Sequence, residues 1–320
     1  MKVRSPRTVA GVVAVVVALG ALVVVLKLAD TVLGRPSGDC SVTVDGHTVE
    51  ISDDQAENAS LIAAIAVRRG LPARATSIAL ATAFQESKLR NIAYGDRDSL
   101  GLFQQRPSQG WGTEEEILDP VYATRAFYDA LVKVDGYESM EITEAAQAIQ
   151  RSAFPGAYAD HEEDGRALAS ALTGYSPASF TCDLDDSAPN SSKDLTDSGL
   201  TERADTVRDA LLERFGNVPL GGFDPGGVRS GHMKGSAHYD GRAIDAFVRP
   251  ISTANKVRGW AMAHWAVANA GRLHIATVIF DDRIWTAGGQ GWRDYDLPAS
   301  AKGDRKILEH RDHVHIDVFR

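Results

Sequence analysis

Several common sequence features are scarce or missing in this chain, and each shortage excludes a class of protein. Positive charge is scarce: the net charge of −9 argues against a nucleic-acid partner, which requires a basic face. No H-E-x-x-H segment occurs, which excludes the thermolysin type of zinc site. No internal repeat is present. The apolar fraction of 44% and the charged fraction of 24% are those of an ordinary globular protein.

Cysteine is also scarce, with Cys40 and Cys182 as the only two. Outside the cytoplasm a disulfide between them can form and persist, and the two residues bracket the first of the domains predicted below. Closing a loop of that length contributes about 4–5 kcal/mol in the chain-entropy description. We therefore expect a disulfide, with two unrelated buried thiols as the alternative.

One long apolar run lies at the N-terminus. Residues 8–26 carry no charge and follow a basic start with Lys2, Arg4 and Arg7. As a helix this run spans roughly 30 Å, the thickness of a bilayer core, and the basic start favours a cytoplasmic N-terminus. We expect a cell-membrane protein with a single pass and its bulk extracytoplasmic. Secretion after signal cleavage is the alternative, although no clean A-x-A site follows the run.

Changes in composition divide the chain into five segments. They are a cytoplasmic tip with the transmembrane or signal segment (1–27), a lead-in (28–49), a mostly helical stretch (50–182), a Ser- and Asp-rich linker (183–199) and a stretch of mixed helix and strand periodicity (200–320). The predicted fold is two domains after an N-terminal membrane segment: a mostly α domain, then an α+β domain with a small antiparallel sheet.

Histidines are concentrated near the C-terminus, where seven of the nine lie beyond residue 230. Alternation along the last predicted strand places His313, His315 and Asp317 on one face. Asp245 shares its strand face with small and apolar residues, where a lone carboxylate is costly and a metal ion offsets the cost. His238 lies in the loop before that strand. A catalytic zinc site needs three protein ligands and an open position, and this pattern supplies two histidines and a carboxylate, with one histidine to spare.

Ser236 to Asp245 reads S-x-H-x-x-G-x-A-x-D, and His313-Val314-His315 supplies an H-x-H segment further on. Together they resemble the signature of the LAS-type zinc peptidases, which include D-Ala-D-Ala carboxypeptidases and murein endopeptidases. The same region also resembles a C-terminal domain of actinobacterial-type exported proteins. The resemblance covers residues from about 200 to 320 and implies hydrolysis of cell-wall peptide bonds.

The resemblance also implies roles for individual residues. His238, Asp245 and His315 correspond to the ligands of Zn²⁺, and Arg229 corresponds to an arginine that contacts the substrate carbonyl or carboxylate. Zinc lowers the pKa of its water and polarises the scissile carbonyl. A neighbouring side chain takes the proton and returns it to the leaving amine, and we assign that step to His313.

Two further residues are expected to assist. The carboxypeptidase branch has a Glu three residues before its last zinc ligand, where this chain has Asp312. The murein endopeptidase branch instead has H-x-x-H-x-H, which residues 310–315 match. We therefore prefer His313 for proton transfer, with His310 and Asp312 as supporting catalytic residues.

The helical stretch carries a second resemblance. A-F-Q-E-S, which ends at Ser87, and G-L-F-Q, which ends at Gln104, are similar to the E-S and G-L-M-Q motifs of lysozyme-like lytic transglycosylases. The resemblance covers roughly residues 50–180 and implies that Glu86, on an apolar helix face that raises its pKa, is a general acid. Gln104 and Tyr158 are candidate contacts to the sugar or to Glu86. The A-Y-N-x-G motif is missing, so a module that binds glycan without cutting it is the alternative.

These patterns together predict a membrane-anchored, zinc-dependent hydrolase of peptidoglycan peptide bonds, with a lysozyme-like module that binds or cleaves glycan. The expected partners are peptidoglycan and, through the N-terminal helix, the membrane, with no nucleic acid. The alternative is a cell-wall-binding or scaffold protein that keeps both folds and has lost turnover.

Overall fold

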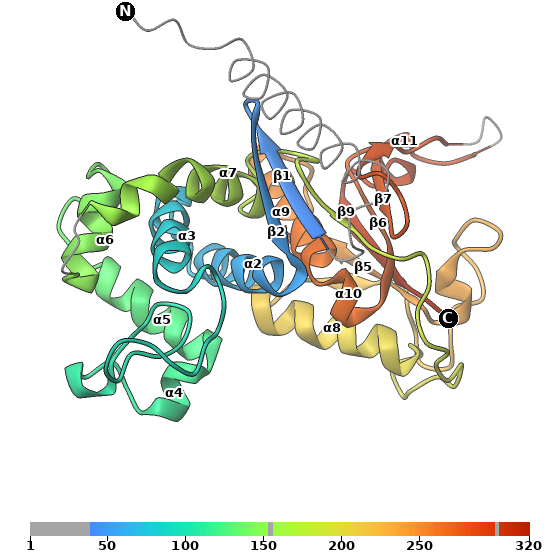
Figure 1. Ribbon diagram of the computed structural model, residues 1–320. Coiled ribbons are helices and arrows are strands. Elements are labelled where there is room, and N and C mark those ends of the chain that lie inside the picture. Colours follow the sequence, from blue (N-terminus) through green and yellow to red (C-terminus); the bar gives the residue numbers. More distant parts are fainter. Residues whose placement is uncertain (1–38, 153–155, 298–300) are drawn as a thin grey trace, which may run out of the picture. The chain divides into compact units, whose positions relative to one another are not determined.

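The computed structural model of the chain describes residues 39–152, 156–297 and 301–320 (Figure 1), all within one compact unit. In chain order the elements are β1 (Asp39–Val44), β2 (His47–Ser52), α2 (Asp53–Arg68), α3 (Ala73–Ser87), η1 (Pro107–Gln109), α4 (Glu114–Leu118), α5 (Pro120–Leu131), α6 (Ile142–Gln150), η2 (Ala157–His161), α7 (Glu162–Leu172), β3 (Phe180–Asp183), α8 (Glu202–Phe215), β4 (Leu220–Gly221), η3 (Ala237–Asp240), β5 (Ala243–Phe247), α9 (Thr253–Ala268), α10 (Ala270–Leu273), β6 (Ile275–Phe280), β7 (Arg283–Thr286), β8 (Arg293–Asp294), α11 (Arg305–Leu308) and β9 (His313–Val318).

The predicted membrane segment, residues 8–26, lies outside the described residues. Within the part of the chain that the structure does describe, no helix is long and apolar enough to cross a bilayer. The predicted single-pass membrane localisation, and the fold prediction that began with a membrane segment, therefore have no support among the described residues.

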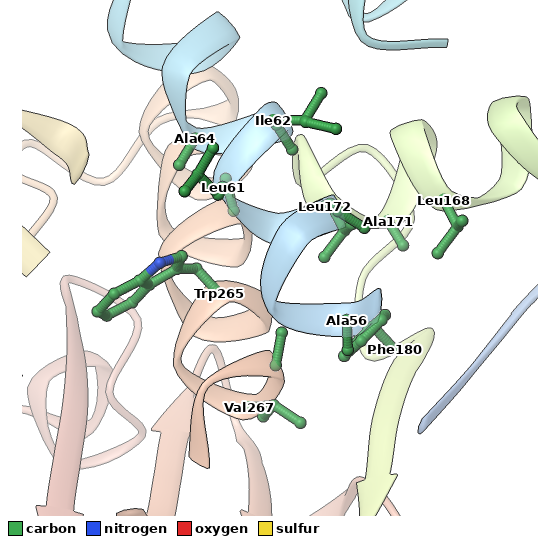
Figure 2. Packing of buried hydrophobic residues seen from close by; sticks show 14 of the residues in the cluster. Ala56, Leu61, Ile62, Ala64, Leu168, Ala171, Leu172, Phe180, Trp265 and Val267 are labelled. Carbon is green, nitrogen blue, oxygen red and sulfur yellow. The ribbon is translucent and has the colours of Figure 1, made fainter. Parts of the chain in front are cut away.

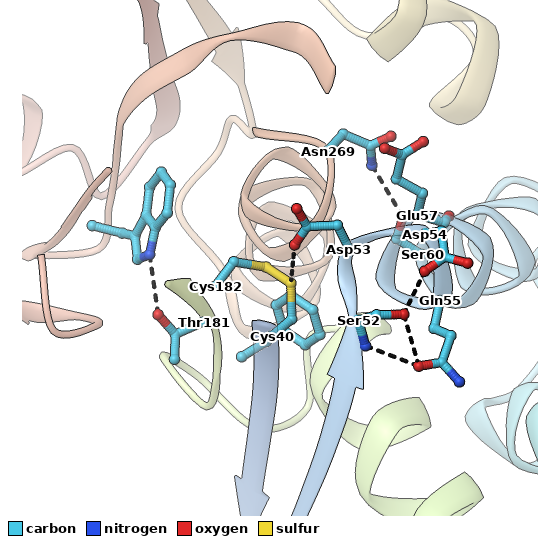
Figure 3. Close-up of a disulfide and its surroundings, with 12 residues drawn as sticks. Cys40, Ser52, Asp53, Asp54, Gln55, Glu57, Ser60, Thr181, Cys182 and Asn269 are labelled. Atoms are coloured by element: carbon cyan, nitrogen blue, oxygen red, sulfur yellow. Dashed lines mark hydrogen bonds between the residues drawn. A yellow bond between two sulfur atoms is a disulfide. The ribbon is translucent and has the colours of Figure 1, made fainter. Parts of the chain in front are cut away.

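A three-stranded antiparallel sheet in the order β2-β1-β3 opens the described chain. The sequence predicts only a lead-in here. The Asp45-Gly46 pair instead turns the chain into the β1–β2 hairpin, and β1 is central because β3 pairs with its other edge. Cys40 on β1 lies directly opposite Cys182 on β3, and their side chains form the expected disulfide (Figure 3). The disulfide prediction is confirmed.

Helices α2 to α7 form the rest of the first half, and α3 contacts α2, α5, α6 and α7. A helix so surrounded must be apolar or small all round, and Ile78 to Phe84 on α3 are all buried. At the start of α2, Ser52 forms a capping box with Gln55, which satisfies free backbone N–H groups at that end. The predicted helical character of this stretch follows from these patterns.

The second half is built on a six-stranded antiparallel sheet in the order β4-β5-β9-β6-β7-β8. Alternation gives this sheet two unlike faces. One face carries Ile244, Val314 and Ile316, all buried, and α9 packs against β6 and β9. The opposite face, which α9 leaves uncovered, carries the polar residues of β5 and β9. This difference between the faces positions the site.

The two halves share one core. Figure 2 shows Leu61 and Ile62 of α2, Leu172 of α7 and Trp265 of α9 in the same cluster of buried side chains. Polar contacts cross the same boundary: Nδ1 of the fully buried His264 donates to the carbonyl of Ala171 at 2.8 Å, and the Asn269 amide donates to Ser60 Oγ at 3.0 Å (Figure 3 shows the latter). The prediction of a mostly α domain followed by a separate α+β domain is therefore corrected to one mixed α/β unit with two antiparallel sheets.

Residues 183–199 run along this unit with several specific contacts. The carbonyl of Leu184 accepts from Gly288 N at 2.7 Å, and the carbonyl of Pro189 accepts from Arg203 at 2.8 Å. Near its end, Ser198 Oγ donates to Asp205 on α8 at 2.8 Å. Backbone carbonyls and the Ser198 hydroxyl thus tie this polar segment to the second half of the chain.

Candidate metal centre

The uncovered face of the large sheet gathers the polar residues that strand alternation predicts. Antiparallel pairing sets Asp245 of β5 opposite His315 of β9, and Phe247 opposite His313. Asp245, His313 and His315 are all buried, each less than a tenth exposed. A cluster of buried ionisable groups persists only where the groups satisfy one another or hold an ion.

His238 reaches the same point from η3, one turn of helix before β5. The Ser236 hydroxyl accepts from His238 N and caps this turn, and Gly241 ends it with φ +64°. A side chain at position 241 would lie 2.7 Å from the carbonyl of Gly199, so glycine is required there. Nδ1 of His238 donates to the carbonyl of Gly222 at 2.7 Å, which leaves Nε2 free to face Asp245 and His315.

The donor atoms of three side chains meet at this point. Nε2 of His238 lies 3.1 Å from Nδ1 of His315 and 3.3 Å from Oδ1 of Asp245, and 3.2 Å separates Nδ1 of His315 from the same oxygen. Donors about 2.0–2.1 Å from a tetrahedral ion lie about 3.3 Å apart, so this triangle has the size of one face of such a site. His232 adds a further donor: His232, His238 and Asp245 have ligand atoms within 4.8 Å of one another and form a candidate metal-binding group.

The charges at the site favour a cation. Burial raises the pKa of Asp245, but hydrogen bonds from His238 and His315 outweigh it and hold that pKa well below its ordinary value. Burial likewise lowers the pKa of His315, but bonds to Asp245 and Asp317 outweigh it and raise the pKa of His315 to about 9. At neutral pH the ionised Asp245 therefore pairs with a protonated His315, and a bound metal ion would replace that proton, because histidine binds a metal only as the neutral ring.

His313 lies beside this triangle and is oriented from behind. Its Nδ1 donates to Asp312 Oδ1 at 2.8 Å, and its Nε2 lies 3.8 Å from Asp245 Oδ1. Asp312 also accepts from Nε of Arg249 at 2.6 Å. Burial raises the pKa of Asp312, but the bonds from His313 and Arg249 outweigh it and keep that pKa below its ordinary value. The result is an imidazole with a fixed tautomer and one nitrogen directed toward the metal point.

His310 occupies the other side of His313. The His310 ring lies 4.7 Å from the ring of His313 and 5.6 Å from the ring of His315, and it meets the ring of Tyr295 edge-on at 5.0 Å. Burial and the neighbouring histidines lower the pKa of His310 to about 2, so it is neutral. This places His310 within the cluster without a direct hydrogen bond to His313 among the described residues.

A cleft of about 770 Å³ opens onto these groups. Its cationic lining residues are Lys234, Arg242, Arg249 and Lys302. The cleft is thus locally basic in an acidic protein, which favours an anionic ligand. Arg229, predicted to contact substrate, is exposed and is absent from the described lining.

The first half holds a separate carboxyl site. Tyr158 Oη donates to Glu86 Oε1 at 2.6 Å. Burial raises the pKa of Glu86, and hydrogen bonds from Tyr158 and Gln150 only partly offset it. Gln104, with φ +46°, donates instead to the carbonyls of Tyr94 and Gly101, both at 3.3 Å. The structure therefore brings Tyr158 to Glu86, and the contacts of Gln104 go elsewhere.

The second half has a counterpart among known families. Residues 196–305 match the family model VldE, C-terminal domain. The match covers less than half of the chain, includes His232, His238 and Asp245, and ends before the histidines of residues 310–315. No curated protein matches the chain.

Two residues that line the cleft were not predicted from the sequence. His232 lies in a glycine-rich loop without strand or helix periodicity, so no pattern aims it at the site. Arg249 lies two residues after the end of β5, and its pairing with Asp312 joins residues 63 apart in the chain. The sequence signal that could have identified Arg249 was its positive charge close to the strand that carries Asp245.

Proposed function

We propose that the second half of this chain is a zinc-dependent hydrolase of peptidoglycan peptide bonds. The observation that carries the proposal is the meeting of Nε2 of His238, Oδ1 of Asp245 and Nδ1 of His315 beside an oriented His313. The family match to residues 196–305 carries no reaction with it, so the proposal stands on this geometry and on the resemblance of residues 236–245 and 313–315 to LAS-type peptidases.

The donor set fits zinc. Two imidazoles and one carboxylate are a common ligand set of catalytic zinc sites. Metal-binding histidines characteristically give their other ring nitrogen to a carbonyl or carboxylate. His238 does so with the carbonyl of Gly222, and Nε2 of His315 lies 3.3 Å from Asp317. Zinc bound here would supply polarisation of the scissile carbonyl and a water of lowered pKa.

The remaining residues act around that ion. In this proposal His313 takes the proton from the attacking water at Nε2 and returns it to the leaving amine. Asp312 accepts from Nδ1 throughout and holds the ring in the orientation and tautomer that present Nε2, as the carboxylate does in a hydrolytic triad. Arg249 keeps Asp312 ionised and presents its guanidinium to the cleft, where it replaces Arg229 as the arginine placed to meet a substrate carboxylate or carbonyl.

The first half is proposed to bind the glycan strands of the same polymer. A half-buried carboxyl of raised pKa that accepts from a tyrosine hydroxyl is suited to protonating a glycosidic oxygen, and the Glu86–Tyr158 pair supports a general-acid role for Glu86. In the alternative, both halves bind the cell wall and neither turns over.

Digestion of peptidoglycan by the purified full chain, with product analysis by mass spectrometry, tests these proposals. Zinc should promote release of peptides and a chelator should abolish it. Asp245→Ala should lose zinc and turnover together, whereas His313→Ala should keep zinc and lose turnover by about 10²–10⁴-fold. His47→Ala, at a histidine that pairs with Asp164 on the surface of the first half, is the matched control and should change neither.

The products also separate the alternatives. Glu86→Gln should remove any glycan-cleavage products and leave the peptide products unchanged. If one equivalent of zinc binds and no peptide is released, the peptidase proposal fails and the wall-binding alternative stands. If no zinc binds, both the metal assignment and the peptidase proposal fail.

A further inference from the structure

His232 lies beside His238 and Asp245 at the edge of the candidate metal site. The ring of His232 stacks on the ring of His238 with centroids 3.9 Å apart and an angle of 24° between the planes. One of its ring nitrogens lies within 4.8 Å of the ligand atoms of both His238 and Asp245. Three protein ligands with an open position characterise a catalytic zinc site, whereas four protein ligands close it. The position of His232 therefore decides which kind of site this is.

The backbone of His232 is held in place by the same turn that carries His238. The hydroxyl of Tyr239 donates to the carbonyl of His232 at 2.6 Å and accepts from its N–H at 3.0 Å. The neighbours on both sides, Gly231 and Met233, are exposed. A loop residue bonded through both of its backbone groups, between exposed neighbours, has a defined position and directs its ring into the cleft that it lines.

The other nearby histidines are less suited to this position. Nδ1 of His313 donates to Asp312, and Nε2 of His313 is the nitrogen that the proposed function assigns to proton transfer. The ring of His310 faces Tyr295 and His313. His232 comes from the loop that precedes η3, and it is the histidine grouped with His238 and Asp245.

We propose that His232 is a fourth protein ligand of the metal, so that the resting site is closed and opens when the loop of residues 223–235 moves away. This inference rests on the proposed function in that His238, Asp245 and His315 hold the ion. Opening breaks the bond from His232 to the metal, whose place a water or substrate oxygen would take, and the two hydrogen bonds to Tyr239, in a loop that contains Gly226, Gly227, Gly231 and Gly235. The loop is thus a gate that a substrate entering the basic cleft displaces.

The number of imidazoles around the metal tests the inference without an activity assay. X-ray absorption fine structure of the zinc-loaded full chain should count three histidine ligands in the wild type and two in His232→Ala. Cobalt(II) absorption should report the matching change from four protein ligands to three with a water. His274→Ala, at a histidine of the same half outside the described lining of the cleft, is the control and should leave three imidazoles.

Tyr239→Phe provides a second variant that keeps the aromatic ring and removes the hydroxyl that holds His232. It should speed zinc removal by a chelator, and His232→Ala should weaken zinc binding roughly 10-fold or more. Two imidazoles in the zinc-loaded wild type would overturn the inference and leave the proposed function intact. Failure of the wild type to bind zinc at all would instead overturn the proposed function, and the inference with it.

Discussion

Replacement of Gly222 by alanine should disable the metal site through a single methyl group. Gly222 has φ +80°, and a Cβ built on it lies 2.3 Å from Cε1 and 2.6 Å from Nδ1 of His238, and 2.9 Å from Oδ2 of Asp245. Ordinary contacts begin near 3.4 Å, so the His238 ring must retreat by about 1 Å, whereas metal–ligand distances tolerate only about 0.2 Å. The hydrogen bond from His238 to the carbonyl of Gly222 is disturbed by the same movement.

Gly226 offers a matched control for this substitution. Its φ is +82° and a Cβ there meets nothing within 4 Å. Both alanine variants therefore carry the same left-handed strain, about 1–2 kcal/mol, and only Gly222→Ala displaces a ligand. Competition with a chromophoric chelator, on samples shown to be folded by circular dichroism, should give a zinc affinity at least 10–100-fold lower for Gly222→Ala. Gly226→Ala should bind zinc as the wild type does.

Two outcomes would refute the reasoning. If both variants bind zinc as tightly as the wild type does, the close approach of the loop to His238 does not fix the ligand, and the position of the ring must be set by other contacts. If both lose zinc equally, the strain of the loop rather than the clash is responsible.

Three further predictions concern the rest of the fold. Tyr158→Phe should raise the pKa of Glu86 further, because the lost hydrogen bond lowers it; an unchanged value in an NMR titration would contradict the assigned contact. Reduction of the Cys40–Cys182 disulfide, which spans 142 residues, should lower the free energy of unfolding by up to about 5 kcal/mol in urea titrations, and equal midpoints before and after reduction would argue against it. Burial lowers the pKa of His264 to about 4, so stability should fall as the pH decreases from 6.5 toward 4, by at most roughly 3 kcal/mol; His264→Asn, which does not titrate, should flatten this part of the pH dependence.

The disulfide illustrates how far local sequence reasoning extends. Two cysteines in the whole chain leave one intramolecular pairing, so Cys40 and Cys182 could be paired from the sequence. The strands that carry them could not be derived in the same way, because β3 is four residues long and follows a helical stretch without a periodic signal. Its place beside β1 depends on a contact between residues far apart in the chain.

The division into two domains failed for a related reason. Composition shows where the helical stretch ends and a polar segment begins, and that change is present in the sequence. It does not show that the buried faces of α2 and α9 are complementary. A helix that is apolar on several sides, such as α9 with Trp260 and Trp265, needs neighbours on each of them, and only the tertiary structure shows that α2 and α7 supply some of those contacts.

Strand alternation by itself determined that His313 and His315 share a face of their strand. It likewise determined that Asp245 shares a face of its own strand with small and apolar residues, because the side-chain period of a strand is a local property. The pairing of Asp245 with His315 was decided only by the tertiary structure, since it depends on the register of β5 against β9, 70 residues apart. The places of Arg249 and His232 were decided there too. A side chain in a loop has no period, so its position follows from the long-range contacts, such as that of Tyr239 with His232, that hold its backbone.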